Sequence, residues 1–235
     1  MYSVSVAMAA YNGEKYIKEQ LESILSQLKE KDEIIVSLDP SQDHTIDVIR
    51  SLKDERIKVL KGPAQGVKKN FENAIKHCQN DIIFLADQDD IWLEGKVEKV
   101  LSCFDKETYV VMHDAKIVDN NYKELVPSFF EMKDVDTGFI HNLIKNGYMG
   151  CCMAFKKDIV PYIVPIPEKI YMHDQWIGMV GDEIGKNVLL KEILLLYRRH
   201  DENVSDIHHG SLVEMMNKRI HILGAYFELK RRLKK

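Results

Sequence analysis

Residues 81–92 read Asp-Ile-Ile-Phe-Leu-Ala-Asp-Gln-Asp-Asp-Ile-Trp. The apolar run at 82–86 is typical of a strand that is buried in a sheet. It ends in the carboxylates Asp87, Asp89 and Asp90. In open α/β sheets, ligands bind beyond the carboxyl ends of the strands. The stretch therefore predicts a buried strand with a polar site at its end.

On the N-terminal side of this stretch, strand-like and helix-like segments alternate. Apolar runs predict the strands, and apolar residues at helical spacing predict the helices, the second of which has Asp43 as a candidate N-cap. The predicted strands are residues 4–9, 34–38 and 57–60, and the predicted helices are residues 14–28, 43–52 and 67–77. This alternation favours βαβ units and a parallel, doubly wound sheet.

The pattern is looser after Lys99. The expected strands are residues 109–112, 148–155 and 188–197, the expected helices are 175–180 and 211–235, and the expected irregular segments are 119–136 and 161–167.

The overall composition limits the class of protein. The chain has 235 residues, of which 45% are hydrophobic and 30% are charged, with a net charge of -4. This net charge does not indicate the positively charged surface that a nucleic-acid-binding protein needs. The four cysteines include no C-x-x-C pair, and neither a leader nor a membrane-spanning run is readable in the sequence. We therefore expect a cytoplasmic protein that holds its cysteines in reduced form.

The acidic segment has two interpretations. Neighbouring carboxylates repel one another and raise each other's pKa unless a cation joins them. Mg²⁺ and Mn²⁺ prefer carboxylate oxygens together with ligand phosphates, so Asp87, Asp89 and Asp90 fit a divalent metal site. The same residues also fit a solvated acidic turn in which Asp90 caps the next helix.

Two other strand ends carry side chains that suit a nucleotide. Asp39 follows the second predicted strand and could accept a hydrogen bond from the imide N–H of uracil or thymine, and Tyr11 follows the first and offers a flat face for a base. Ordinary turns explain Asp39-Pro40-Ser41 and Asn12-Gly13 equally well.

The order and spacing of these motifs resemble family-two glycosyltransferases with the A-type fold. The similarity lies in Ala-Ala-Tyr-Asn-Gly at 9–13, Asp-Pro-Ser-Gln-Asp at 39–43 and the acidic segment, and it continues at 66–71 and 147–155. Leu38 and Pro40 depart from the family's usual Asp-Asp-Gly-Ser pattern. The 66–71 segment, the acidic segment and Tyr-Arg-Arg-His at 197–200 are most similar to the bacterial rhamnosyltransferase-like branch.

The resemblance implies the architecture. It predicts an α/β protein with the glycosyltransferase A-type fold, in which a Rossmann-like half contains a mixed central sheet. The nucleotide-sugar half would span residues 1–100, the acceptor half residues 101–205, and a C-terminal basic amphipathic helix residues 206–235.

The resemblance also implies roles for individual residues. The metal, Mn²⁺ or Mg²⁺, would be held by Asp89 and His200. The acceptor side would include Met149, Gly150 and Trp176. The residues expected to bind the UDP- or dTDP-sugar donor are Ala9, Ala10, Tyr11, Asn12, Asp39, Lys68, Asn70, Asp87, Gln88, Arg198 and Arg199.

Asp174 resembles the catalytic acid of the family, which lies at the start of a helix beneath the acceptor. Its chemistry fits an inverting, single-displacement transfer in which the carboxylate takes the proton of an acceptor hydroxyl. The expected acceptor is a glycan or a lipid-linked sugar in cell-surface polysaccharide synthesis. Asp174 also fits the simpler role of helix N-cap, and the two roles are compatible.

The basic amphipathic tail fits an anionic membrane at the inner face of the cell, because such helices often lie on lipid surfaces. It fits packing against the body of the protein or against a second subunit in a homodimer equally well. Two other functions remain open: a sugar-phosphate nucleotidyltransferase and a non-catalytic nucleotide-sugar scaffold. The first usually has a Gly-rich, Arg-containing loop after strand one, which residues 9–14 lack, and the second would not need Asp87, Asp89 and Asp174.

Overall fold

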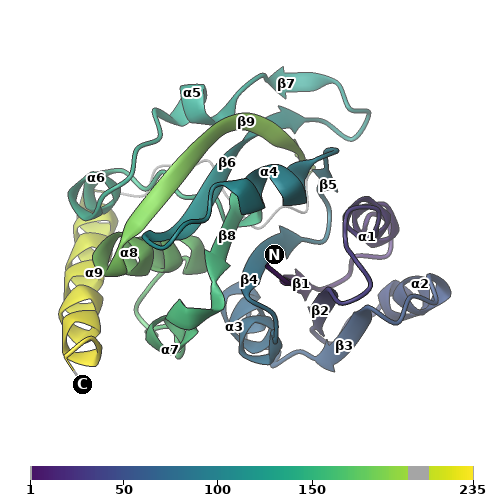
Figure 1. Cartoon of the computed structure of the whole chain (residues 1–235), viewed down its shortest axis with the longest axis horizontal. Helices are drawn as coiled ribbons and strands as arrows, with labels where there is room; N and C mark the ends of the chain where they lie inside the picture. The colour runs from purple at the N-terminus through teal and green to yellow at the C-terminus, as the bar shows by residue number, and fades with distance from the viewer. Residues whose placement is uncertain (1, 201–211, 235) are drawn as a thin grey trace.

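The computed structural model of the chain describes residues 2–200 and 212–234. Its strands form a mixed sheet in the order β3-β2-β1-β4-β8-β6-β9-β5, and β7 pairs with β6 (Figure 1). The strands are β1 (Val4–Ala10), β2 (Glu33–Leu38), β3 (Ile57–Lys61), β4 (Ile82–Asp87), β5 (Ile91–Trp92), β6 (Thr108–Val118), β7 (Glu124–Val126), β8 (Met153–Lys156) and β9 (Lys186–Arg198).

Helices flank this sheet. They are α1 (Ile17–Leu25), α2 (Thr45–Ser51), α3 (Val67–His77), α4 (Lys96–Ser102), α5 (Phe129–Lys133), α6 (Phe139–Ile144), α7 (Val160–Ile163), α8 (His173–Ile184) and α9 (Leu212–Arg232), with 3-10 turns η1 (Gly150–Cys152) and η2 (Lys157–Ile159).

The first four strands form the predicted parallel half of the sheet. β1 pairs in parallel with β2 and β4, and β2 pairs in parallel with β3. In this register Ala9 lies opposite both Ser37 and Asp87, so these strands end at one edge of the sheet. The loops that carry Tyr11 and Asp39 leave from that edge.

The second half makes the sheet mixed, as the predicted fold requires. β8 is antiparallel to both β4 and β6, whereas β9 is parallel to β6. The short strand β5 is antiparallel to β9, with Ile91 opposite Leu196. This pairing brings the acidic segment beside the end of β9, more than a hundred residues later in the chain.

Several predicted elements were wrong in detail. The predicted strand at 148–155 is η1 followed by the short strand β8, and the segment at 161–167 begins with the end of α7. The excursion at 119–136 contains β7 and α5, and α1 and α8 differ in length from their predictions. Asp43 is not the N-cap of α2, because that helix begins at Thr45 after His44.

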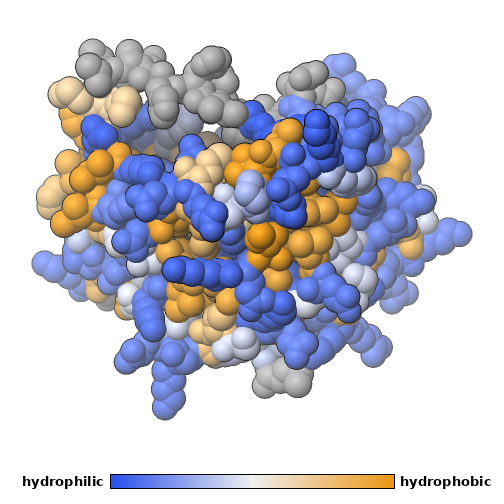
Figure 2. All heavy atoms as spheres, turned by 90° about the horizontal axis from the view of Figure 1, so that it is seen from above, coloured by the Kyte–Doolittle hydropathy of each residue, from blue (hydrophilic) through white to orange (hydrophobic). Residues whose placement is uncertain are grey.

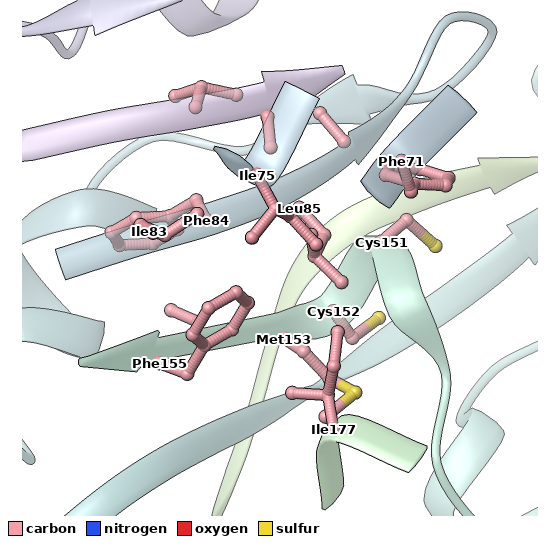
Figure 3. Close-up of a cluster of buried hydrophobic side chains, with 14 of the residues drawn as sticks. Phe71, Ile75, Ile83, Phe84, Leu85, Cys151, Cys152, Met153, Phe155 and Ile177 are labelled. Carbon is pink, nitrogen blue, oxygen red and sulfur yellow. The ribbon is translucent and has the colours of Figure 1, made fainter. Parts of the chain in front are cut away.

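The core lies between β4, β8, α3 and α8. Figure 3 shows Phe71, Leu85, Phe155 and Ile177 in one cluster, and each of these side chains is fully buried. Packing of α8 against this cluster fixes its N-terminus, which carries Asp174, near the sheet edge that holds the acids.

The tail forms α9, which confirms the predicted helix over 212–232, while the predicted boundary at residue 205 lies outside the described residues. One face of α9 packs on the protein through Ile222, Ala225 and Leu229. Within the described ranges, no helix combines the length and the apolar character that crossing a membrane requires.

Candidate active site

Two buried polar side chains, Asp39 and Asn70, lie together at the end of β2. Asp39 is largely buried, and its Oδ1 accepts a hydrogen bond from the backbone N–H of Ala64 at 2.8 Å. Asn70 is buried beside it and donates through Nδ2 to the Ala10 carbonyl at 3.2 Å. Oδ1 of Asn70 has no hydrogen-bond partner among the described residues. This arrangement requires Gly62, because a Cβ there would lie 2.3 Å from Oδ1 of Asp39.

The loop after β1 presents an exposed aromatic ring directly after Ala10, whose carbonyl accepts from Asn70 and from the backbone N–H of Asp39. Tyr11 is 54% exposed, whereas its backbone N–H and carbonyl both pair with the Gln88 amide at 2.9 Å. Asn12 adopts a left-handed φ of 47° and accepts a hydrogen bond from the backbone N–H of Gln42. Gln88 and Asn12 therefore shape the loop, and the exposed surface of Tyr11 can stack on a base.

The acidic segment is not a solvated turn. Asp90 is fully buried, its Oδ1 accepts the backbone N–H of Arg198 at 3.1 Å, and its Oδ2 lacks a hydrogen-bond partner in the described part of the chain. Burial and the neighbouring Asp89 raise the pKa of Asp90 well above its usual value. Burial, Asp89 and Asp174 also raise the pKa of Asp87. A bound cation would relieve this repulsion.

Asp89 and His200, the two predicted metal ligands, lie together. Nε2 of His200 lies 2.8 Å from Oδ2 of Asp89, and the imidazole stacks on Tyr16 with ring centroids 4.6 Å apart. Carboxylate oxygen and imidazole nitrogen are ligands that Mn²⁺ accepts, and Mg²⁺ accepts the carboxylate. The donor set thus fits a divalent ion at Asp89.

Arg198 connects the acidic segment to the rest of the protein. Its guanidinium donates to Glu19 at 2.7 Å and to the Asp89 carbonyl at 3.0 Å, and it also donates to the Tyr122 hydroxyl. These contacts hold the loop of Asp89 in place. The backbone N–H of Arg199 donates to the Val118 carbonyl at 2.8 Å, and the predicted contact of both arginines with the diphosphate stays a prediction.

Asp174 lies in the first turn of α8 and is 7% exposed. Its Oδ1 accepts the backbone N–H of Gln175 at 2.6 Å. Burial raises its pKa to about 6, which suits a general base at neutral pH. Because Asp174 contributes to the raised pKa of Asp87, Asp174 and the acidic segment act electrostatically on one another.

Gly150 packs closely against the start of α8, next to Asp174. A Cβ at Gly150 would lie 2.9 Å from Nε2 of His173 and 3.6 Å from the Cβ of Asp174. The His173 ring is buried and stacks on Phe71 at 4.1 Å, so it has little room to move. Met149, the preceding residue, is half-buried.

The side chains of two predicted site residues make hydrogen bonds within the protein. Trp176 is fully buried and its indole N–H donates to the Ile163 carbonyl at 2.9 Å, so its predicted place on the acceptor side is wrong. Nζ of Lys68 donates to the carbonyls of Glu168 and Ile170, each at 2.7 Å. These bonds use the Lys68 ammonium to hold the loop before α8, and its predicted contact with the donor stays a prediction.

Sequence reasoning missed Lys96 and Cys151. Sγ of Cys151 and one carboxylate oxygen each of Asp87 and Asp90 lie within 4.8 Å of one another. Nζ of Lys96 is fully buried and donates to the Cys151 carbonyl at 3.0 Å. One feature of the sequence could have pointed to Lys96: it follows the acidic segment by six residues and shares a helix face with Val100, which α4 buries.

Residues 5–163 match the family model described as Glycosyl transferase family 2. The chain belongs to this family. The predicted resemblance to family-two glycosyltransferases is thereby confirmed. Family membership supports a glycosyltransferase that uses a nucleotide sugar.

Named bacterial relatives agree with this assignment. The chain is 31% identical over 233 residues to "UDP-Glc:alpha-D-GlcNAc-diphosphoundecaprenol beta-1,3-glucosyltransferase WfgD" of Escherichia coli, which covers 97% of this chain and 87% of that protein. It is 27% identical over 216 residues to "dTDP-rhamnosyl transferase RfbG" of Shigella flexneri, covering 83% and 72%. An uncharacterized glycosyltransferase of Nostoc is 26% identical, and the chain spans 66% of its length.

Solved structures show the same fold. Residues 1–349 of Staphylococcus aureus TarS, in complex with UDP-GlcNAc, match with a TM-score of 0.73 and 19% identity over 98% of this chain and 69% of that one. The mannosyltransferase PcManGT of Pyrobaculum calidifontis, in complex with GDP-Man and Mn²⁺, matches with a TM-score of 0.63 and 16% identity over 98% and 64%. At these identities the likeness confirms the predicted A-type fold.

Proposed function

We propose that the chain is an inverting, metal-dependent glycosyltransferase that moves a hexose or deoxyhexose from a UDP- or dTDP-sugar to an acceptor hydroxyl. The observation that carries this proposal is Asp174, a buried carboxylate with a pKa of about 6 that acts electrostatically on Asp87. As the acceptor oxygen bonds to the anomeric carbon, the bond from that carbon to the diphosphate breaks. Asp174 takes the acceptor's proton, and no covalent intermediate with the enzyme is needed.

Asp89, with His200, would hold a divalent ion, which neutralises the negative charge on the departing diphosphate when it is bound. The buried environment supports this role because electrostatic interactions are stronger there than in water. Arg198 keeps the Asp89 loop in position through its bond to the Asp89 carbonyl.

The base of the donor would lie beside Asp39. One oxygen of Asp39 accepts from Ala64, which leaves the carboxylate further lone pairs for the imide N–H of uracil or thymine. The Tyr11 ring would stack on the base. WfgD and RfbG are named for UDP-glucose and dTDP-rhamnose, and they support these two bases for this chain without choosing between them.

The acceptor we propose is a lipid-linked sugar, which would bring the enzyme to a membrane surface through α9. Along this helix a stripe of exposed apolar side chains recurs at helical spacing: Met216, Ile220, Leu223 and Phe227. The exposed residues Arg231 and Lys234 continue the same face at the end of the helix. Figure 2 shows hydrophobic residues at the edge of the molecule that α6 and α9 form. Apolar residues followed by cations fit an anionic bilayer.

A donor screen tests the transfer reaction. We expect one UDP- or dTDP-sugar to raise the melting temperature only with Mn²⁺ or Mg²⁺, and Asp89→Ala to lose that effect. Asp174→Asn should bind the donor and release no diphosphate. Release of pyrophosphate from a nucleoside triphosphate would replace the proposal with a nucleotidyltransferase, and donor binding without any turnover by the wild type would indicate a scaffold.

Sedimentation with vesicles tests the membrane contact. The protein should pellet with vesicles that contain phosphatidylglycerol, but not with phosphatidylcholine alone, and Ile220→Ser with Phe227→Ser should abolish the binding. Asn217→Ser, an exposed polar position on the same helix, is the matched control. A concentration-dependent dimer that the same pair of substitutions dissociates, without vesicle binding, would instead assign the face to a second copy of the chain.

A further inference from the structure

A lysine ammonium lies buried directly behind the acidic segment. Lys96 is fully buried, donates to the Cys151 carbonyl at 3.0 Å and places Nζ 4.0 Å from the centre of the Trp92 ring. Burial lowers the pKa of Lys96, while the Trp92 ring face and the Cys151 carbonyl are both partners that suit an ammonium. A buried cation is costly unless neighbouring charges compensate it. Cys151, whose carbonyl accepts from Lys96, lies with its Sγ beside Asp87 and Asp90, and both carboxylates act electrostatically on the ammonium.

The acidic segment offers a cation two different positions. The outer position is Asp89 with His200. The inner position is formed by Asp87, Asp90 and Cys151, whose ligand atoms lie within 4.8 Å of one another. The inner position is drier, and Oδ2 of Asp90 has no hydrogen-bond partner among the residues described. Two carboxylates with a thiolate would suit a thiophilic divalent cation such as Co²⁺ or Zn²⁺.

We propose that Lys96 is a positioning residue that excludes divalent cations from the inner position and so directs the metal to Asp89. The metal at Asp89 rests on the proposed function, whereas the exclusion depends only on the contacts of Lys96. A fixed positive charge behind two carboxylates supplies part of the neutralisation that a metal would otherwise provide. It also repels a divalent ion strongly, because buried charges are poorly screened.

Lys96 also joins the two halves of the site. It lies at the first residue of α4, beyond the acidic segment, yet its ammonium binds the carbonyl of a residue in η1, next to Gly150. Neutral Lys96→Gln retains an N–H donor for that carbonyl, so it removes the charge while keeping much of the link. Lys96→Arg keeps the charge and serves as the matched control.

Co²⁺ alone is the probe, because a cysteine thiolate bound to Co²⁺ gives an intense near-ultraviolet charge-transfer absorption that oxygen and nitrogen ligands do not give. Binding requires the thiol to lose its proton to the buffer. The wild type and Lys96→Arg should bind Co²⁺ without this band. Lys96→Gln should show the band, with an affinity at the inner position about 100-fold or more above the wild type, as removal of one buried charge implies. Adding Cys151→Ser to Lys96→Gln should abolish the band.

Two results would overturn the proposal: a thiolate band in the wild type that Cys151→Ser removes, or a folded Lys96→Gln without the band. If Lys96→Gln does not fold, comparison of the wild type with the single variant Cys151→Ser still tests the proposal. Exclusion requires that the two proteins have the same Co²⁺ spectrum and the same Co²⁺ affinity. If the wild type binds no Co²⁺ and Lys96→Gln shows the band, the proposed exclusion by Lys96 stands. The metal at Asp89 in the proposed function is then refuted. The two proposals can therefore fail separately.

Discussion

Replacing Asp174 by Asn should stabilise the protein at neutral pH while it abolishes transfer. The carboxyl of Asp174 is 7% exposed, and its pKa is raised by burial to about 6 from a model-compound value of 3.8. The folded protein therefore binds the Asp174 proton more tightly than the unfolded chain does. This contribution to stability is full below the unfolded pKa and is lost as the pH rises through the folded pKa.

The shift sets the size of the effect. A difference of one pKa unit corresponds to about 1.4 kcal/mol, so ionised Asp174 lowers the free energy of unfolding by about 3 kcal/mol above pH 7. Asn is nearly isosteric and carries no charge. Its carbonyl oxygen can still accept the backbone N–H of Gln175, which the carboxylate accepts at 2.6 Å. The stability gained on substitution should therefore be about 2 kcal/mol larger at pH 7.5 than at pH 4.

Urea unfolding of both proteins at several pH values measures this difference, and contributions from all other ionisable groups largely cancel. Asp182→Asn is a useful control, because it is another carboxyl of α8 with a raised pKa, and it accepts from Tyr148 away from Asp174. It should leave diphosphate release largely intact. If the stabilities of wild type and Asp174→Asn stay parallel from pH 4 to 7.5, the Asp174 carboxyl is not held in a state of raised pKa, and its assignment as a base poised near neutrality fails.

The remaining predictions concern single contacts. For the wild type, kcat/KM should rise from pH 5 to 7 with a midpoint near 6, as Asp174 ionises; a flat profile in steady-state assays would count against this base. Tyr11→Ala should raise the donor KM about tenfold, by loss of stacking, and leave the melting temperature unchanged because the ring is 54% exposed; an unchanged KM would remove Tyr11 from the donor site. Gly150→Ala should lower the free energy of unfolding by about 1–3 kcal/mol and should also lower kcat, because its Cβ would lie 2.9 Å from the His173 ring. An unchanged midpoint of denaturant unfolding would show that the His173 ring moves to make room.

The parallel half of the fold was predictable because its signals are local. Continuous apolar runs at β1, β2 and β4 alternate with helical patterns, and each strand ends in a recognisable polar residue. The second half was harder, because β8 is short and its first predicted residues form η1 instead. Pairing of β5 with β9 depends on register between segments far apart in the sequence, which no local pattern specifies.

The same distinction applies to the site. Asp39, Asp87 and Asp89 could be proposed from the sequence because they follow strands whose ends meet at one edge of the sheet. The burial of Trp176 was not predicted, since neighbouring residues on a helix point in different directions and this one points into the core.

Lys96 was missed for the opposite reason: a lysine at the start of a helix normally belongs to the surface. Its ammonium is buried between the ring of Trp92 in β5 and the Cys151 carbonyl of η1. The ring is close in the sequence, but the carbonyl lies 55 residues later, so no pattern near Lys96 specifies the second contact. If Lys96 acts as we propose, tertiary structure supplies a positive charge that a count of acidic residues in the sequence leaves out.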